Sequence, residues 1–491
     1  MRPIIYWFRK DLRLEDQPAL TGLARSGQPV VPVFIWAPHE EGEDGQWAPG
    51  AASRVALHQA LGALGAALEG VGSRLILART RPAAGSGAAN FLQSMAKTLN
   101  AAAIHCTPRF DPAGRAQEEN VELALRSLGI PLIRQGSPGL YPPWESRKAD
   151  ATPYRVFTPF YKNLQTKAPP ALPLAAPALL AAPATWPASE PLKSLALLPA
   201  IGWDSGFAAL GPNTPAGGRA ALASFLGAPL RNYPAGRDVP SQAGTSRLSM
   251  HLAWGQISVQ RLWHEARAFD PVAAEPFVRQ LAWRDFGQHL LYHFEHTPTR
   301  PLDAKFAGFP WRWPESPEGH ADPAAARDFK AWCHGQTGYP LVDAGMRELW
   351  ATGWMHNRLR MVVGSFLVKH LRLHWLCGAR WFWDTLMDAD LANNTLGWQW
   401  IAGCGADAAP YFRIFNPVTQ SRRFDASGAY IRRWVPELAN LDTAHLHAPW
   451  EVPPLALASA GVMPGVTYPH PIVGLTQGRD GALAAYAQMR V

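Results

Sequence analysis

The sequence predicts a two-domain protein, with an α/β domain at the N-terminus and an all-helical domain at the C-terminus. Three observations support this fold class. Short apolar strands alternate with Ala/Leu-rich helical stretches over the first 135 residues, an Ala/Pro-rich stretch follows, and apolar residues at helical spacing dominate from about residue 220. We therefore expect an α/β domain over residues 1–135, a connector over 136–219 and a helical domain over 220–491.

The N-terminal domain is predicted to hold a parallel, Rossmann-like sheet of five strands. Strand and helix in alternation imply parallel pairing, because each helix returns the chain to the same end of the sheet. The strands are expected at residues 3–6, 30–36, 73–78, 102–106 and 130–134. Helices are expected at residues 53–68 and 116–128. No G-x-G-x-x-G sequence follows the first strand, so an ordinary dinucleotide site is not expected there.

The connector and the helical domain differ sharply in composition. Residues 168–199 contain too many prolines for a long helix or a central strand, so we expect this stretch to lie on the surface. Further along, the apolar periodicity predicts helices at residues 276–292 and 353–373.

Composition and charge narrow the class of protein. The chain is 47% hydrophobic and 17% charged, which is typical of a globular protein, and its net charge of +8 is compatible with a polyanionic partner. The four cysteines show no zinc-site spacing, so we expect no metal site and reduced thiols in the cytoplasm. No signal peptide opens the chain, and no long uncharged apolar run predicts a membrane span.

Residues 375–417 form the most unusual stretch of the chain. Five tryptophans fall within the 26 residues from Trp375 to Trp400, beside Asp388, Asp390 and Asn394. These polar side chains cannot all be buried unless something accepts or donates their hydrogen bonds, and a flat heteroaromatic ligand would do so. The alternative is a solvated loop after a helix. The density of indoles, which are costly to expose, favours a ligand pocket.

Two further stretches have the composition of binding sites. Residues 244–249, Gly-Thr-Ser-Arg-Leu-Ser, precede a predicted helix and could cradle a pyrophosphate, although a plain helix N-cap explains them equally well. Gln280, Trp283 and Arg284 share one face of the helix predicted at 276–292, where a buried amphipathic face is the alternative.

Together with Thr337–Leu349 and Trp354–Met361, the 375–417 stretch resembles the DNA photolyase/cryptochrome family. The segments Trp7–Arg13 and Tyr154–Tyr161 are also similar to motifs of that family, with Gln17 where asparagine is usual. The resemblance implies a light-driven, FAD-dependent enzyme that repairs UV-damaged DNA, active as a monomer. It also implies that the N-terminal domain could hold an antenna chromophore, methenyltetrahydrofolate or a deazaflavin, although the Pro108–Pro112 segment departs from the common pattern.

The resemblance also assigns residues to the cofactor. Asn394 matches the residue that faces flavin N5, where an amide cannot readily supply a proton. Trp398, Trp375 and Trp311 match a relay of three tryptophans that photoreduces FAD from the surface. The residues expected to bind FAD are Tyr233, Thr245, Ser246, Arg247, Leu248, Ser249, Arg284, Asn357, Asp388, Asp390 and Asn394.

The residues expected to meet DNA distinguish three activities. Asn357 and Met361 are the pair typical of cyclobutane-dimer repair, whereas (6-4) photolyases carry histidines there. Gln280 stands where cyclobutane-dimer photolyases usually carry glutamate, which keeps (6-4) repair and a cryptochrome-like photoreceptor as alternatives. The expected substrate and DNA contacts are Arg237, Gln280, Trp283, Asn357, Arg358, Met361, Trp400, Arg413 and Gln420.

Overall fold

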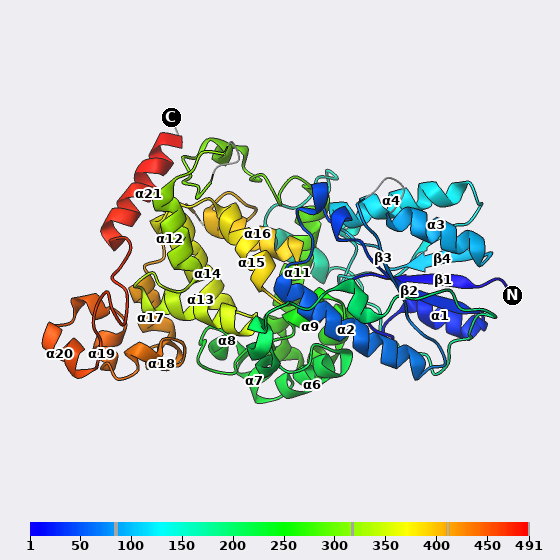
Figure 1. Cartoon of the computed structure of the whole chain (residues 1–491), viewed down its shortest axis with the longest axis horizontal. Coiled ribbons are helices and arrows are strands. Elements are labelled where there is room, and N and C mark those ends of the chain that lie inside the picture. The colour runs from blue at the N-terminus through cyan, green and yellow to red at the C-terminus, as the bar shows by residue number, and fades with distance from the viewer. Residues whose placement is uncertain (83–86, 316–318, 409, 412, 490–491) are drawn as a thin grey trace.

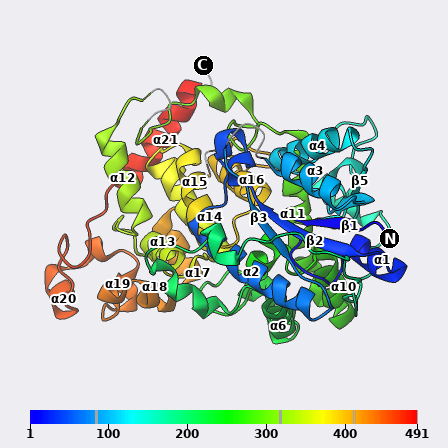
Figure 2. The same cartoon turned by 45° about the vertical axis from the view of Figure 1, so that its right-hand side comes forward.

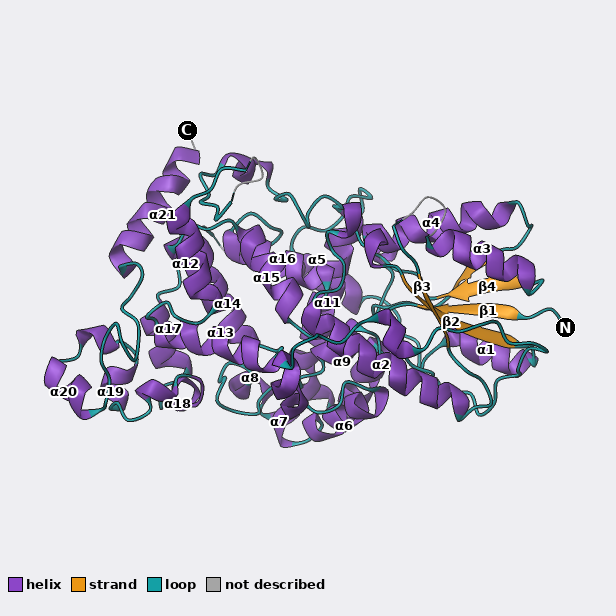
Figure 3. Cartoon of the chain, in the orientation of Figure 1, coloured by secondary structure: helices purple, strands orange, loops and turns teal. Residues whose placement is uncertain are grey.

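The computed structural model describes residues 1–82, 87–315, 319–408, 410–411 and 413–489. Figure 1 shows a sheet with flanking helices on one side of the molecule and a larger helical part on the other, as Figure 3 makes plain by secondary structure. The five strands are all parallel, in the order β3-β2-β1-β4-β5. They are β1 (Ile4–Phe8), β2 (Val30–Trp36), β3 (Ile76–Arg79), β4 (Ala103–Cys106) and β5 (Leu132–Arg134). The predicted fold class is confirmed.

Helices cover both faces of this sheet, which explains why β1 and β2 are buried along their whole length. The helices are α1 (Pro18–Ser26), α2 (Ala51–Glu69), α3 (Ala88–Thr98) and α4 (Pro112–Arg126). Apolar side chains of α1 and α2 form one core and those of α3 and α4 another. Strands are added on one side of β1 up to β3 and on its other side from β4 on, so the topological switch point of the sheet lies between the paired strands β1 and β4.

The connector runs along the sheet domain. Within it, helix α5 (Phe157–Gln165) comes before the proline-rich stretch and packs against α11 (Pro271–His293) of the helical part. Farther along, the Leu180 and Glu190 amides donate hydrogen bonds of 2.9 Å to the carbonyls of Val71 and Leu77. The proline-rich stretch is thus held in extended form by backbone hydrogen bonds to the domain.

The helical part contains the remaining α-helices of the described residues. They are α6 (Pro215–Phe225), α7 (Ala228–Arg231), α8 (Tyr233–Gly236), α9 (Ser249–Ala253), α10 (Val259–Phe269), α11 (Pro271–His293), α12 (Pro323–Cys333), α13 (Pro340–Thr352), α14 (Asn357–Ser365), α15 (Trp375–Thr385), α16 (Leu391–Ala402), α17 (Pro417–Phe424), α18 (Ala429–Trp434), α19 (Thr443–Leu446), α20 (Pro454–Ser459) and α21 (Leu475–Met489). Figure 2 shows α14, α15 and α16 at the centre of this part, with α21 along its outer side.

The helix predicted at residues 353–373 is confirmed over residues 357–370, where α14 runs directly into a π-helical turn, η7 (Phe366–His370). Its start was predicted four residues too early. Gly353 adopts a left-handed conformation (φ 70°) and ends α13, and the His356 side chain accepts a hydrogen bond from the Arg358 amide to begin α14.

Two hydrogen bonds to backbone carbonyls, which we call the interdomain latch, join the two domains. The Leu12 amide donates to the Trp254 carbonyl at 3.0 Å, and the Arg13 guanidinium donates to the Gly255 carbonyl at 2.8 Å. Gly255 has φ +65°, and a Cβ there would lie 2.1 Å from the Lys10 carbonyl oxygen. Only glycine permits this close approach of the domains.

Two expectations about chemistry can be compared with the structure. All four cysteines are free thiols. Within the described ranges, no cluster of His, Cys, Asp or Glu has the arrangement of a metal site, and no helix is long and apolar enough to cross a membrane.

Candidate functional site

The turn between α15 and α16 places two carboxylates side by side. The Arg360 guanidinium donates to Asp388 Oδ2 at 2.7 Å, while the other carboxylate oxygen of Asp388 is buried without a partner in the described part of the chain. Asp390 caps α16 by accepting from the Asn393 amide at 2.9 Å. Both side chains are largely buried, which excludes the alternative that residues 388–394 form a solvated loop.

Asp390 also joins α16 to α11. Its Oδ2 lies 3.4 Å from Arg284, whose guanidinium also donates to the Leu252 carbonyl of α9 at 3.3 Å. Burial alone would raise the pKa of the Asp390 carboxyl, but the charges of Arg284 and Lys10 and the hydrogen bonds from Asn393 lower it overall. The carboxylate is thus charged at neutral pH.

A cavity opens beside this ion pair. Arg284, Asp390 and Ala392 line it on the helical side, and it extends to the interface with the sheet domain at Lys10 and Arg13. Arg284 Nε is also buried without a partner in the described structure. Unsatisfied buried donors and acceptors at one cavity are the expected features of a site that binds a polar, flat ligand.

The predicted phosphate cradle lies at the start of α9. Gly244 packs on Gly236, where a Cβ would be 2.3 Å from a carbonyl oxygen, and Arg247 has φ 52° with its guanidinium 5.1 Å from the centre of the Trp354 ring. The N-cap residue of α9 is Leu248, which makes no side-chain cap bond. The plain N-cap alternative is therefore not what residues 244–249 provide. Tyr233 is buried nearby, with Arg237 over its ring at 5.3 Å.

Asn394 is held in one orientation. Its Nδ2 donates to the Ala379 carbonyl of α15 at 2.9 Å, so the amide oxygen remains as the group that can face a ligand. An oxygen in this position accepts a hydrogen bond and cannot give a proton.

The outward side of α11 carries the predicted substrate residues. One face of the Trp283 indole stacks on Phe157 of α5, with ring centres 3.8 Å apart and planes 8° apart. Arg237 donates to the Gln280 amide oxygen at 3.3 Å. Phe157 was not among the predicted site residues; its neighbourhood was recognised only as a family-like motif.

Helix α14 supplies the other predicted wall. The Met361 sulfur lies 4.0 Å from Asn357 Nδ2 and 3.8 Å from Arg358 Nη1. Arg358 also pairs with Asp238 at 2.7 Å and lies 4.2 Å from the ring centre of Phe424 on α17. Asn357 and Met361 are thus adjacent, as predicted, whereas Arg358 is engaged by partners that the sequence did not indicate.

The remaining predicted DNA contacts lie on α16 and on the chain that follows it. Arg413 is exposed, Gln420 is half-buried on α17, and Trp400 is half-buried on α16 against the main core. None of these three makes a side-chain hydrogen bond or ion pair with another predicted site residue in the described structure.

The three tryptophans expected to form the relay lie at different depths. Trp398 and Trp375 are buried, and Trp311 is half-buried. His374 fills the space between the outer two, with its ring centre 5.4 Å from those of both Trp375 and Trp311. Trp313 stacks on the same histidine at 3.9 Å. Trp311 and Trp313 thus both contact His374, which in turn contacts Trp375.

Gly378 determines where Trp398 lies. A Cβ on Gly378 would be 2.0 Å from the Trp398 ring, a distance that no relaxation of a rigid indole on a buried helix can absorb cheaply. We expect Gly378→Ala to displace Trp398 and to slow light-driven reduction of the bound flavin by at least about tenfold. Flavin absorbance followed under blue light measures this rate. Gly397→Ala, where a Cβ meets nothing within 4 Å, is the matched control and should photoreduce normally.

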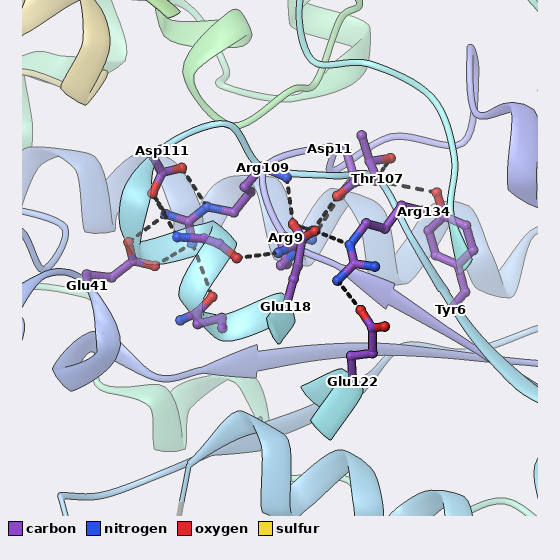
Figure 4. A network of polar contacts seen from close by, with 12 residues as sticks. Tyr6, Arg9, Asp11, Glu41, Thr107, Arg109, Asp111, Glu118, Glu122 and Arg134 are labelled. Atoms are coloured by element: carbon purple, nitrogen blue, oxygen red, sulfur yellow. Dashed lines mark hydrogen bonds and ion pairs between the residues drawn. The ribbon is translucent and has the colours of Figure 1, made fainter. Parts of the chain in front are cut away.

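The carboxyl end of the sheet holds a separate ion network, drawn in Figure 4. Arg109 binds both Glu41 and Asp111 at 2.7 Å, and Glu118 binds Arg9 at 2.7 Å and Arg134 at 2.6 Å. Arg9 and Arg109 follow the paired strands β1 and β4. The carboxyl ends of these strands, where an open α/β sheet usually binds a ligand, thus carry the ion network, and Lys10, Arg109 and Asp111 also line the cavity beside Arg284 and Asp390.

Comparisons with known proteins agree with this geometry. Residues 4–178 match the family model of DNA photolyase, and residues 277–488 match that of the FAD binding domain of DNA photolyase. A deoxyribodipyrimidine photo-lyase of Agrobacterium fabrum is 41% identical over 99% of this chain and 98% of its own length. Cryptochrome-1 of Arabidopsis thaliana is 36% identical over 99% of this chain and 70% of its own length.

Solved structures show the same relationship. A bacterial class III photolyase from Agrobacterium tumefaciens superposes with a TM-score of 0.91 at 41% identity, covering 100% of this chain and 98% of that one. A Synechocystis cryptochrome reaches 0.86 at 29% identity, covering 98% and 99%.

Fold and site together define a two-domain flavoprotein, with a cavity between the helical domain and the sheet domain beside Arg284 and Asp390. The chain belongs to the DNA photolyase/cryptochrome family, and its cofactor is FAD. The unsatisfied atoms of Asp388 and Arg284 fit this cofactor, because a flavin carries donors and acceptors along one edge.

Proposed function

We propose that this chain is a photolyase that repairs cyclobutane pyrimidine dimers in DNA under light. The main support for the proposal is that α11 contributes residues both to the cofactor cavity and to the predicted lesion site. Arg284 reaches inward to Asp390 at the cofactor cavity, while its neighbour Trp283 presents an indole braced by Phe157 on the outer side. A base lesion stacked on Trp283 would thus lie one helical turn or less from the cofactor pocket.

Bound FAD in its reduced form would supply an electron on excitation and recover it after the dimer ring has opened. The protein's part is binding and orientation. The lesion leaves the base stack, as is general for enzymes that act on bases, and stacks on Trp283. Gln280 accepts from Arg237 through its oxygen and donates one N–H to the Pro276 carbonyl at 3.4 Å, which leaves its second amide N–H to donate to the flipped bases. Asn394 presents an acceptor and withholds a proton.

A cryptochrome-like photoreceptor without repair activity is the second candidate. Gln280 supports it, since an amide lacks the charge of the glutamate that repair enzymes of this family usually carry. The similarity to Arabidopsis cryptochrome-1 supports it as well. A (6-4) photolyase is less well supported, because Asn357 and Met361 offer no proton donor of the histidine type.

The deciding experiment uses the full chain with reduced FAD and two oligonucleotides, one with a cyclobutane thymine dimer and one with a (6-4) product. Restored thymines are counted under blue light and in the dark. Light-dependent repair of the cyclobutane dimer alone is the expected result. No repair of either lesion by protein whose flavin photoreduces would contradict the proposal and favour the photoreceptor.

Gln280→Glu is expected to speed dimer repair. A carboxylate would turn the 3.3 Å hydrogen bond between the charged Arg237 guanidinium and a neutral amide into an ion pair, which fixes the side chain more firmly. A gain of about 1 kcal/mol in the transition state corresponds to roughly fivefold in rate. Single-turnover repair under saturating light measures it. Gln280→Leu, which removes donor and acceptor together, should instead repair more slowly than the wild type; a slower Glu variant would oppose this interpretation.

A further inference from the structure

Lys369 is a fully buried cation that none of the proposed chemistry uses. It lies in the π-helical turn η7 at the end of α14 and is 1% exposed. Within the described residues it has no carboxylate partner. Burial holds its pKa well below the usual value. A side chain this costly to bury is expected to have a specific task.

The lysine connects two segments that flank the proposed DNA surface. Its Nζ donates to the Ala402 carbonyl at 3.2 Å and to the Tyr411 carbonyl at 3.1 Å. Ala402 is the last residue of α16, where unpaired carbonyls attract a donor or a positive charge. Nζ also lies 3.3 Å from the centre of the Tyr411 ring, so both the backbone and the ring of Tyr411 are held.

Two other contacts hold the same segment. Four residues before Lys369, the Ser365 hydroxyl accepts from the Phe415 amide at 3.3 Å. On the outer side, Tyr486 of α21 stacks on Tyr411, with ring centres 4.7 Å apart and planes 11° apart. Helix α21 itself packs against η7, along the edge of the helical domain in Figure 1. Tyr411 and Phe415 are therefore each held in place, and they lie on either side of Arg413 in the sequence.

Arg413 lies between these two held residues and is exposed. The helix that runs into the η7 turn begins at Asn357 and carries Met361. We propose that Lys369, together with Ser365, positions the Arg413 segment for contact with the DNA backbone, so that one helix sets the spacing between the lesion pocket and a phosphate contact. This inference rests on the proposed DNA-binding function. Lys369 is a positioning residue, because it is buried and cannot touch DNA itself.

The test is the salt dependence of DNA binding by the FAD-loaded full chain. Each lost phosphate contact lowers the slope of log K against log[salt] by about 0.9. Arg413→Ala should lose about one such unit, and Lys369→Met should lose a similar amount without removing any exposed charge. The double variant should lose no more than Arg413→Ala alone, since both changes abolish one contact. Ser365→Ala, a milder change, should move the slope in the same direction by less.

Controls separate positioning from general damage. Val363→Ala trims a buried side chain of the same helix that holds no part of the Arg413 segment, and it should lower thermal stability while keeping the wild-type slope. Flavin absorbance and photoreduction should be retained in Lys369→Met. A wild-type slope in Lys369→Met beside a reduced slope in Arg413→Ala would overturn the positioning role, and so would additive losses in the double variant. If wild-type protein does not prefer UV-irradiated over intact duplex, the proposed function is contradicted. The salt slopes of wild type and variants on intact duplex would still test the role of Lys369. If wild-type protein binds neither duplex, the proposed function and the role of Lys369 are both refuted.

Discussion

Asp390→Ala protein is expected to lose most of its FAD and to unfold at a lower temperature. The substitution removes the cap of α16, which is worth about 1 kcal/mol. It also leaves Arg284 buried without its carboxylate, and an uncompensated buried charge of this kind costs about 3 kcal/mol or more. The ratio of flavin to protein absorbance after purification, with a thermal melt of the same sample, measures both effects.

Asp390→Asn separates the two contributions. Asparagine is as good an N-cap as aspartate, so the start of α16 should survive while the charge is lost. We expect an intermediate flavin content and a smaller loss of stability. Stoichiometric FAD in Asp390→Ala would show that the Arg284–Asp390 pair is not part of the cofactor site.

Trp283→Ala is expected to weaken binding to dimer-containing DNA by about tenfold to a hundredfold, because stacking of a base on an aromatic ring is worth about 1–3 kcal/mol. Binding to undamaged duplex should change little, since the indole contacts only bases that have left the stack. Competition between lesion-containing and intact oligonucleotides in the dark measures the ratio without any repair.

Trp283→Phe is the matched control, because a smaller ring can still stack on Phe157. It should retain a measurable share of the discrimination. An equal loss of affinity for damaged and intact DNA in Trp283→Ala would mean that the indole supports the fold of α5 and α11 rather than the lesion.

The fold was largely predictable because its signals are local. Continuous apolar runs such as residues 30–36 predict buried parallel strands, and β2 has the predicted bounds. Strand β3 begins three residues later than expected, because residues 73–75 do not join the sheet. The helix expected over 353–373 is present but begins four residues later, because hydrophobic periodicity does not register a left-handed glycine or a histidine cap.

The residues of the candidate site could be predicted from the sequence, but the residues that they pair with could not. Asp388 and Asp390 could be proposed from their unusual apolar surroundings, but nothing local indicates that Arg360 pairs with the first and Arg284 with the second. Phe157 behind Trp283 lies more than a hundred residues away in sequence. Such pairs arise only when the helices pack, so the chemistry of single residues cannot identify them.

The latch between the domains has a thermodynamic consequence. Leu12 and Arg13 bind carbonyls of Trp254 and Gly255, immediately after the helix whose Leu252 carbonyl binds Arg284. The first loop of the sheet domain thus lines the cavity through Lys10 and Arg13 and also binds the backbone three residues beyond Leu252. Separate melting of the sheet domain would break these bonds and loosen the cavity, so the protein should unfold as a single cooperative unit that releases its flavin in the same transition.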